Sequence, residues 1–237
     1  MFVASYPRAG STWLRFLLND VLTGACSDFA SVNRNIPHVG SHANAFQLPG
    51  GARLIKTHEM FRREYQQAIY LARDPRDVLI SEYNYLLGRG FGISSLESFA
   101  ADFVKGKVNG NGSWQAHTRS WLEAAKLNPR ILVLRFEDLR RDPEAVLDRI
   151  LTYLGIPANR DRTRAAIADN TVARMREKEL MTPQKASRKG RFINNGAVGG
   201  WGQRLGAQAL RAVEHSCLEE MLRLNYEPSI ERVPVQA

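Results

Sequence analysis

Three stretches of the sequence place polar side chains directly after a short apolar run. The first of them, residues 6–13, reads Tyr-Pro-Arg-Ala-Gly-Ser-Thr-Trp and follows Phe2-Val3-Ala4. A small glycine-containing turn that leads into a helix presents unpaired backbone N–H groups and the positive end of the helix dipole, which together favour an oxyanion. Arg8 adds a planar cation, while Ser11 and Thr12 add hydroxyl donors. The stretch predicts a phosphate-binding loop, and its candidate residues are Arg8, Ala9, Gly10, Ser11, Thr12 and Trp13.

The second stretch, residues 68–73, is an apolar run that ends in Arg73 and predicts a buried strand. Asp74 and Pro75 then predict the start of a helix, because a carboxylate can cap free N–H groups and proline fits the first helical position. Ser81 comes about two turns into that helix. Arg73 is therefore expected at the carboxyl end of a strand, where open α/β sheets bind their ligands.

The third stretch, residues 53–57, predicts a short strand that is followed by His58. Lys56 and His58 point to the same side of an extended chain and can face one reacting centre. Because histidine titrates near neutrality, His58 is the candidate general base for an attacking hydroxyl. The Lys56 ammonium can stabilise charge on a leaving oxygen, and Arg8 is the second candidate for that task. Glu59 points to the opposite face if the strand continues, and it is the competing base.

Together these stretches resemble the sulfotransferases that use 3′-phosphoadenosine 5′-phosphosulfate. That family's nucleotide loop is usually written Tyr-Pro-Lys-Ser-Gly-Thr-Thr-Trp, so Arg8 stands at the lysine position, and its Lys-Thr-His matches residues 56–58. The resemblance implies that Arg73 and Ser81 hold the 3′-phosphate, the group that distinguishes this donor from ATP. It also implies transfer of a sulfuryl group to an acceptor hydroxyl or amine. Because such a transfer has a loose, in-line transition state, positioning and charge stabilisation provide most of the catalysis.

The family's last signature, Arg-Lys-Gly-x-x-Gly-Asp-Trp, is matched imperfectly. Arg188-Lys189-Gly190 fits its start, but Trp201 comes six residues too late. Either a longer loop still lets Arg188 and Lys189 reach the 3′-phosphate, or Arg191 replaces them with hydrogen bonds from the segment around Gly196. The residues assigned to the nucleotide on this basis are Arg188, Lys189, Gly190 and Gly196, with Asn194 and Asn195 as alternatives.

Adenine contacts are less well matched than phosphate contacts. Val172 replaces the phenylalanine that would contact adenine in the family, so Trp13 is the remaining stacking candidate. The acceptor is expected to be a small molecule: a phenol, an alcohol or a sugar. Two long, irregular, glycine-containing segments, residues 26–51 and 88–112, are the candidate acceptor loops. Four aromatic residues could line an acceptor pocket: Phe46, Tyr83, Tyr85 and Phe91.

Other function classes fit the sequence less well. A net charge of +9 would attract any polyanion, but the basic residues are spread through mixed-charge segments without an aromatic-rich recognition module, so no nucleic-acid partner is expected. An ATP-dependent phosphotransferase of related fold is the main alternative, although the loop lacks the Gly-Lys-Ser/Thr of the Walker pattern. His38 and His42 are interrupted by Gly40 and are predicted to be loop residues, so no metal is expected.

The elements that must position these residues alternate along the chain. Strands are expected at 1–6, 53–57, 68–73 and 131–135, and helices at 11–23, 75–87, within 95–127, and near 143–154, 160–168 and 205–224. This alternation predicts an α/β fold with a central parallel sheet flanked by helices, a P-loop-like nucleotide-binding architecture, in one domain over residues 1–237. A chain of this length with 44% hydrophobic residues can bury such a core.

Cysteine usage and hydropathy bear on the compartment. Cys26 and Cys217 are far apart and lack metal-like spacing, and the first residues lack the basic-then-apolar pattern of a signal peptide. No apolar run approaches the length that spans a bilayer. The sequence therefore predicts a cytoplasmic enzyme without a membrane partner, and leaves its oligomeric state open.

Overall fold

The computed structural model describes residues 1–41, 45–48, 53–183, 192–194 and 196–229. Its sheet has four strands, β1 (Phe2–Ser5), β2 (Ile55–Thr57), β3 (Ala68–Ala72) and β4 (Ile131–Arg135). They are all parallel and lie in the order β2-β1-β3-β4. The predicted parallel α/β fold is thus confirmed; β4 has its expected bounds, and the other three strands are slightly shorter than expected.

Side chains of successive strand residues pack on opposite faces of the sheet, as the two-residue repeat of a strand requires. Tyr70 belongs to one buried apolar cluster, while its neighbours Ile69 and Leu71 belong to the other. Every residue of β3 is buried. A central strand covered on both faces explains why residues 68–72 form a continuous apolar run instead of an alternating one.

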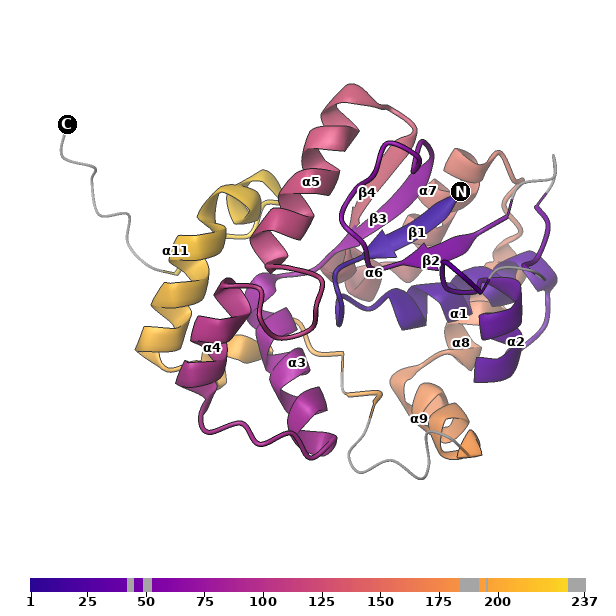
Figure 1. Ribbon diagram of the computed structural model, residues 1–237. Coiled ribbons are helices and arrows are strands. Elements are labelled where there is room, and N and C mark those ends of the chain that lie inside the picture. Colours follow the sequence, from indigo (N-terminus) through magenta and orange to yellow (C-terminus); the bar gives the residue numbers. More distant parts are fainter. Residues whose placement is uncertain (42–44, 49–52, 184–191, 195, 230–237) are drawn as a thin grey trace.

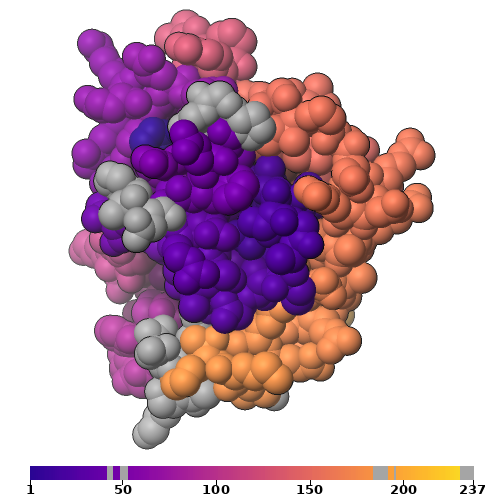
Figure 2. All heavy atoms as spheres, turned by 90° about the vertical axis from the view of Figure 1, so that its right-hand side faces the viewer, coloured from indigo at the N-terminus to yellow at the C-terminus, as the bar shows by residue number. Residues whose placement is uncertain are grey.

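Helices cover both faces of this sheet (Figure 1). One face carries α3 (Pro75–Gly88), α4 (Leu96–Val104), α5 (Trp114–Leu127) and α11 (Ala207–Arg223). The other carries α1 (Ser11–Thr23), α6 (Phe136–Arg141), α7 (Pro143–Leu154) and α8 (Arg160–Asp169). Figure 2 shows the indigo N-terminal segment that contains α1 lying beside the orange segment that contains α8, in agreement with the packing of α1 against α8.

Three short helices were not predicted: α2 (Phe29–Asn35), α6 and α9 (Val172–Leu180). Two of them, α2 and α9, begin with a side-chain cap, whereas α6 has none. Asp28 and Ser31 form a capping box at α2, and the Thr171 side chain accepts the Arg174 N–H at α9. A short 3₁₀ helix, η2 (Gly200–Gln203), precedes α11.

The carboxyl ends of the four strands meet at one edge of the sheet, and a helix begins directly after three of them: α1 after β1, α3 after β3 and α6 after β4. As predicted, the Asp74 side chain caps α3 by accepting the Arg76 N–H at 2.9 Å, and Pro75 occupies its first turn. No helix in the described part of the chain is long and apolar enough to cross a membrane. The edge at the strand ends is where the predicted site residues gather.

Candidate active site

A cavity of about 550 Å³ opens at this edge of the sheet. Its walls come from the loop after β1, from the end of β2, from α3 and from the segment around residue 192. The predicted site residues among those described that line it are Arg8, Gly10, Ser11, Thr12, Trp13, Lys56, His58, Arg73, Ser81 and Gly196. Residues that lie up to 188 positions apart in the sequence therefore share one cavity.

The loop after β1 has the geometry of an anion site. Gly10 caps α1 with φ 97°, a left-handed conformation, and a Cβ atom there would collide with the Phe136 ring. No side chain caps α1, and its first turn holds no acidic residue. The N-terminal amides of α1 therefore face the cavity without a competing carboxylate. Ala9 alone among the predicted loop residues does not line the cavity; its N–H donates to the Tyr6 carbonyl at 3.2 Å.

Arg8 joins the phosphate loop to α3 and to the segment at residue 192. Its backbone is left-handed (φ 64°), its Nε donates to Ser81 Oγ at 3.2 Å, and its Nη2 donates to the Phe192 carbonyl at 3.0 Å. The guanidinium carbon lies 4.6 Å from the centre of the Tyr85 ring, a cation–π contact. Burial lowers the pKa of Arg8, yet a guanidinium stays charged at physiological pH. Ser81 keeps its own O–H proton for a further acceptor, since a hydroxyl can accept and donate together.

Arg73 is buried, with 7% of its surface exposed. Its Nη1 donates to the Arg8 carbonyl at 3.0 Å and its Nη2 to the Ala197 carbonyl at 2.9 Å, while its guanidinium carbon lies 4.5 Å from the centre of the Phe136 ring. Its Nε atom is buried without a hydrogen-bond partner in the described structure. A buried cation with a vacant donor is suited to an anionic ligand.

His58 is held in one tautomer. Its Nδ1 lies 2.7 Å from the Ser5 carbonyl oxygen, which can only accept, so Nδ1 carries the proton and Nε2 is the free acceptor. Burial, and next the charge of Lys56, hold the pKa of His58 well below 6.5. The ring is therefore neutral at pH 7, with a lone pair on Nε2 available for a proton.

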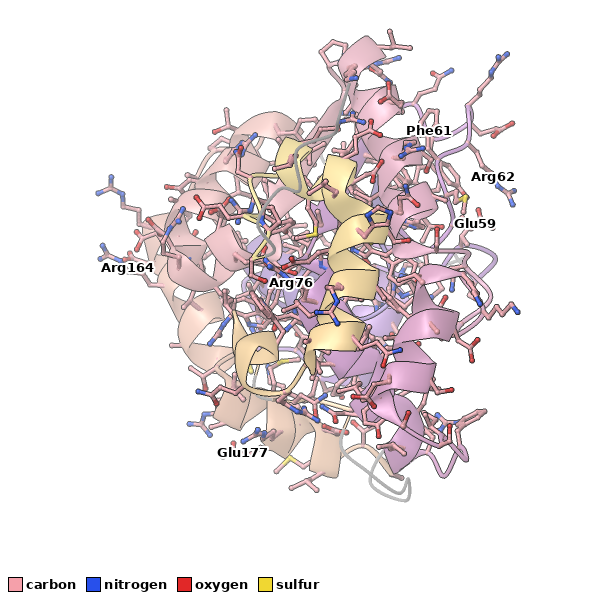
Figure 3. The ribbon with its side chains drawn as sticks, turned by 90° about the vertical axis from the view of Figure 1, so that its left-hand side faces the viewer. Glu59, Phe61, Arg62, Arg76, Arg164 and Glu177 are labelled. Atoms are coloured by element: carbon pink, nitrogen blue, oxygen red, sulfur yellow. The ribbon has the colours of Figure 1, made fainter. Side chains whose placement is uncertain are left out.

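Lys56 is buried on β2 and lines the same cavity as His58, as the sequence predicts for residues two apart. Glu59 does not line it: its carboxylate accepts from the Tyr65 hydroxyl and lies 3.3 Å from Arg62. Figure 3 shows Glu59 and Arg62 together at the edge of the molecule. This geometry favours His58 over Glu59 as the base.

One face of α5 holds the chain from His58 to Phe61, a feature missed at the sequence level. His117 Nε2 donates to the His58 carbonyl at 3.1 Å, Trp121 Nε1 donates to the Glu59 carbonyl at 3.1 Å, and Ser120 Oγ accepts from the Phe61 N–H at 3.0 Å. These three α5 residues have the i, i+3, i+4 spacing that shares one helix face. Burial lowers the pKa of His117 to about 4, so its ring stays neutral. Their spacing along the sequence was the signal from which a shared polar helix face could have been predicted.

Phe192, Ile193, Asn194 and Gly196 line the cavity, and the described residues of this segment are held by two carboxylates. Glu179 accepts the N–H groups of Phe192 and Ile193 at 2.6 and 2.8 Å, and Asp77 accepts those of Gly199 and Trp201 at 2.8 and 3.1 Å. Two buried carboxylates thus fix this segment to α9 and to α3. Arg188, Lys189 and Gly190, together with Arg191 and Asn195, lie outside the described residues, whereas Asn194 and Gly196 line the cavity.

Both predicted acceptor loops contribute to the cavity. Asn33 and His38 come from the first, and Asn109 and Asn111 from the second. Of the four aromatic residues predicted for an acceptor pocket, Tyr85 lines the cavity, whereas Phe46, Tyr83 and Phe91 do not.

Arg15 on α1 lines the cavity and was not predicted. Its Nη2 donates to Asn33 Oδ1 at 3.0 Å, and its buried Nε atom has no hydrogen-bond partner in the described structure. Within the described ranges, no group of three or more metal-ligating side chains is present.

Comparison with known proteins identifies the family. The family model described as "Sulfotransferase domain" matches residues 1–225, and the chain belongs to this family. Human sulfotransferase 2B1 is 29% identical over 221 residues, which cover 85% of this chain and 60% of that protein. Rat sulfotransferase 1A1 is 24% identical over 231 residues, covering 85% of this chain and 77% of that protein. The chain thus spans about 60% of the length of the first of these relatives and about three quarters of the second.

Solved structures share the fold. Mouse sulfotransferase SULT7A1 complexed with PAP superposes with a TM-score of 0.74 at 21% identity, over 93% of this chain and 83% of that one. Retinol dehydratase in a complex with retinol and PAP gives a TM-score of 0.76 at 16% identity, over 97% of this chain and 82% of that one. The predicted family and its P-loop-like α/β fold are confirmed.

Proposed function

We propose that this protein transfers a sulfuryl group from 3′-phosphoadenosine 5′-phosphosulfate to a hydroxyl or amine of a small acceptor. The proposal rests on one observation: the phosphate loop, Lys56, His58 and Arg73 all line the same cavity. Family membership and the PAP in the titles of two structural neighbours support the choice of donor. The free thiols Cys26 and Cys217 fit the cytoplasmic compartment that we also propose.

The described residues fit the anionic groups of this donor. The uncapped N-terminus of α1 and the hydroxyls of Ser11 and Thr12 suit the 5′-phosphosulfate. Arg73, with its vacant Nε donor, and the Ser81 hydroxyl suit the 3′-phosphate. Trp13 lines the cavity with its ring 6.1 Å from that of Phe136, and offers a face to adenine. Arg188, Lys189 and Gly190 remain assigned to the 3′-phosphate by the resemblance.

The chemistry that the donor supplies is an activated S–O bond, which breaks as a new S–O bond to an acceptor hydroxyl, or S–N bond to an acceptor amine, forms. His58 accepts the acceptor proton on Nε2, the nitrogen that the Ser5 carbonyl leaves free. Lys56 stabilises negative charge on the bridging oxygen, with Arg8 as the second cation available. The products are a sulfate ester or sulfamate and 3′,5′-bisphosphoadenosine, and no metal takes part.

Thermal shift with 3′,5′-bisphosphoadenosine, AMP and ATP tests the donor. The bisphosphate is expected to stabilise the protein most, because it alone of the three carries the 3′-phosphate that distinguishes the proposed donor. A ligand at 100 times its Kd adds about 2.7 kcal/mol to the free energy of unfolding. A larger shift with ATP would instead support a phosphotransferase. Salt-sensitive retention on immobilised nucleic acid without a bisphosphate shift would support a nucleic-acid binder.

A substitution at the base tests the mechanism. His58→Ala is expected to lower kcat by about 10²–10⁴-fold while leaving bisphosphate binding nearly intact. His215→Ala, at an exposed position on α11, is the matched control and should keep wild-type activity. If the His58→Ala protein remains active, a group other than His58 is the general base.

A further inference from the structure

Glu82 on α3 is a buried carboxylate in a cavity whose other charged lining residues are cations. Only 3% of its surface is exposed, and it is the single acidic residue among the described residues that line the cavity. The cationic lining residues are Arg8, Arg15, Lys56, Arg73 and Arg140. Sulfate and phosphate groups explain those cations, but a carboxylate repels the same groups, so Glu82 requires another explanation.

The Glu82 carboxyl is only partly satisfied within the protein. Burial raises its pKa, while the nearby Arg8 charge and a hydrogen bond from Asn109 lower it. The Oε2 atom is buried and has no hydrogen-bond partner among the described residues. None of the ion pairs within 4.0 Å in the described structure includes Glu82, because Arg8 donates to Ser81 and to the Phe192 carbonyl instead. Burying a charged oxygen without a partner is costly, which indicates that a ligand supplies one.

Its neighbours place Glu82 on the acceptor side of the cavity. Asn109, whose side chain lies close enough to the Glu82 carboxyl to lower its pKa, donates to the Tyr6 hydroxyl at 3.1 Å, and that hydroxyl donates to the Gly112 carbonyl at 3.0 Å. Asn109 and Gly112 belong to the segment between α4 and α5, the second predicted acceptor loop. The carboxylate therefore adjoins the second predicted acceptor loop.

We propose that the vacant Glu82 oxygen receives a protonated amine of the acceptor, so that this enzyme sulfates the hydroxyl of an amine-bearing small molecule. The proposal rests on the proposed sulfotransferase activity and narrows its acceptor class. An ammonium supplies both a hydrogen bond and a compensating charge, whereas a neutral hydroxyl supplies only the first. The cationic walls that bind the donor would repel an ammonium elsewhere in the cavity, and this leaves Glu82 as its position.

Two probes that differ only in the ammonium group test the proposal. Binding of tyramine and of 4-ethylphenol is measured by calorimetry on the protein saturated with 3′,5′-bisphosphoadenosine, which removes any need for turnover. Tyramine is expected to bind about 10–100-fold more tightly, as a charge-assisted hydrogen bond implies. Equal binding, or tighter binding of 4-ethylphenol, overturns the proposal.

Glu82→Gln keeps the shape of the side chain and removes its charge. In this variant the affinities for tyramine and 4-ethylphenol should differ by no more than about threefold. Glu64→Gln, at an exposed position, removes one negative charge elsewhere and should keep the wild-type preference. A preference that survives in Glu82→Gln overturns the proposal. If the bisphosphate stabilises the protein but tyramine does not bind, only the acceptor class is wrong; if the bisphosphate fails to stabilise it, the donor assignment falls as well.

Discussion

Replacing His117 should damage catalysis without damaging donor binding. The His117 ring donates one hydrogen bond to the His58 carbonyl at 3.1 Å and lies 3.3 Å from the Tyr70 hydroxyl through its other nitrogen. His117→Leu fills the space but removes both nitrogens. The Tyr70 hydroxyl keeps its bond to Thr118 at 3.0 Å, so the unpaired group left behind is the His58 carbonyl.

The size of the effect on stability and on kcat follows from the loss of the one hydrogen bond to the His58 carbonyl. A buried carbonyl without its donor costs about 1–3 kcal/mol, which lowers Tm by roughly 2–12 °C in a chain of this size. If His58 moves by about 1 Å as its backbone relaxes, kcat falls by about 100-fold. The affinity for 3′,5′-bisphosphoadenosine should stay within about threefold of wild type, because no hydrogen bond joins the phosphate loop to α5 among the described residues. The His117 ring does pack against Tyr6, with 5.3 Å between the ring centres, and leucine presents an apolar side chain to that ring in its place.

His117→Gln separates positioning from a general loss of structure. Its amide can donate to the same carbonyl, so kcat should recover to within about tenfold of wild type. Steady-state kinetics at saturating donor measure kcat, and calorimetry measures bisphosphate affinity. In a His58→Ala background, His117→Leu should lower kcat no further, because the group that it positions is absent. Wild-type kcat in a folded His117→Leu protein, or an equal loss in both His58 backgrounds, would refute the reasoning.

Three further outcomes are expected. Because burial and Lys56 hold the pKa of His58 well below 6.5, the base stays unprotonated as the pH falls to 6.5, and kcat/KM should decline only at lower pH; a midpoint above 6.5 in the pH profile would contradict this. Gly10→Ala should lower the free energy of unfolding by more than the roughly 1–2 kcal/mol expected for Gly155→Ala, since both residues are left-handed but only Gly10 faces an aromatic ring; equal losses in urea titrations would exclude the collision. Cys26 is exposed and should react with a thiol reagent in the native protein, whereas Cys217 is buried with a raised pKa and should react only after unfolding; rapid labelling of both would contradict its burial.

Much of the fold could be predicted from the sequence because the central strands are short apolar runs that end in polar residues. Residues 68–72 are buried on both sides, so their pattern has no polar interruption and the strand end at Arg73 is sharp. The same reasoning placed Lys56 and His58 together. The three missed helices have seven, six and nine residues, too few for a helical repeat to stand out against the neighbouring loops.

The site was less predictable where long-range contacts decide it. Glu82 reads as an ordinary helical position, and only the fold shows that its carboxylate is buried against Asn109. Arg15 likewise reads as a polar residue on an amphipathic helix, yet it is buried in the cavity wall. The sequence also suggested Phe46 as a cavity residue, whereas the structure places it in a separate pocket beside Leu22. Side-chain contacts between residues more than ten positions apart cannot be predicted from local sequence patterns.

The two carboxylates that fix residues 192–201 have a consequence for biosynthesis. Arg8 and Arg73 emerge from the ribosome early, but the carbonyl groups of Phe192 and Ala197 to which they donate are made much later. Asp77 likewise waits for the Gly199 amide, 122 residues further on, so these buried charged groups lack their native partners while the intervening chain is made. The walls of the cavity can therefore be completed only after residues 192–194 and 196–201 have been synthesised.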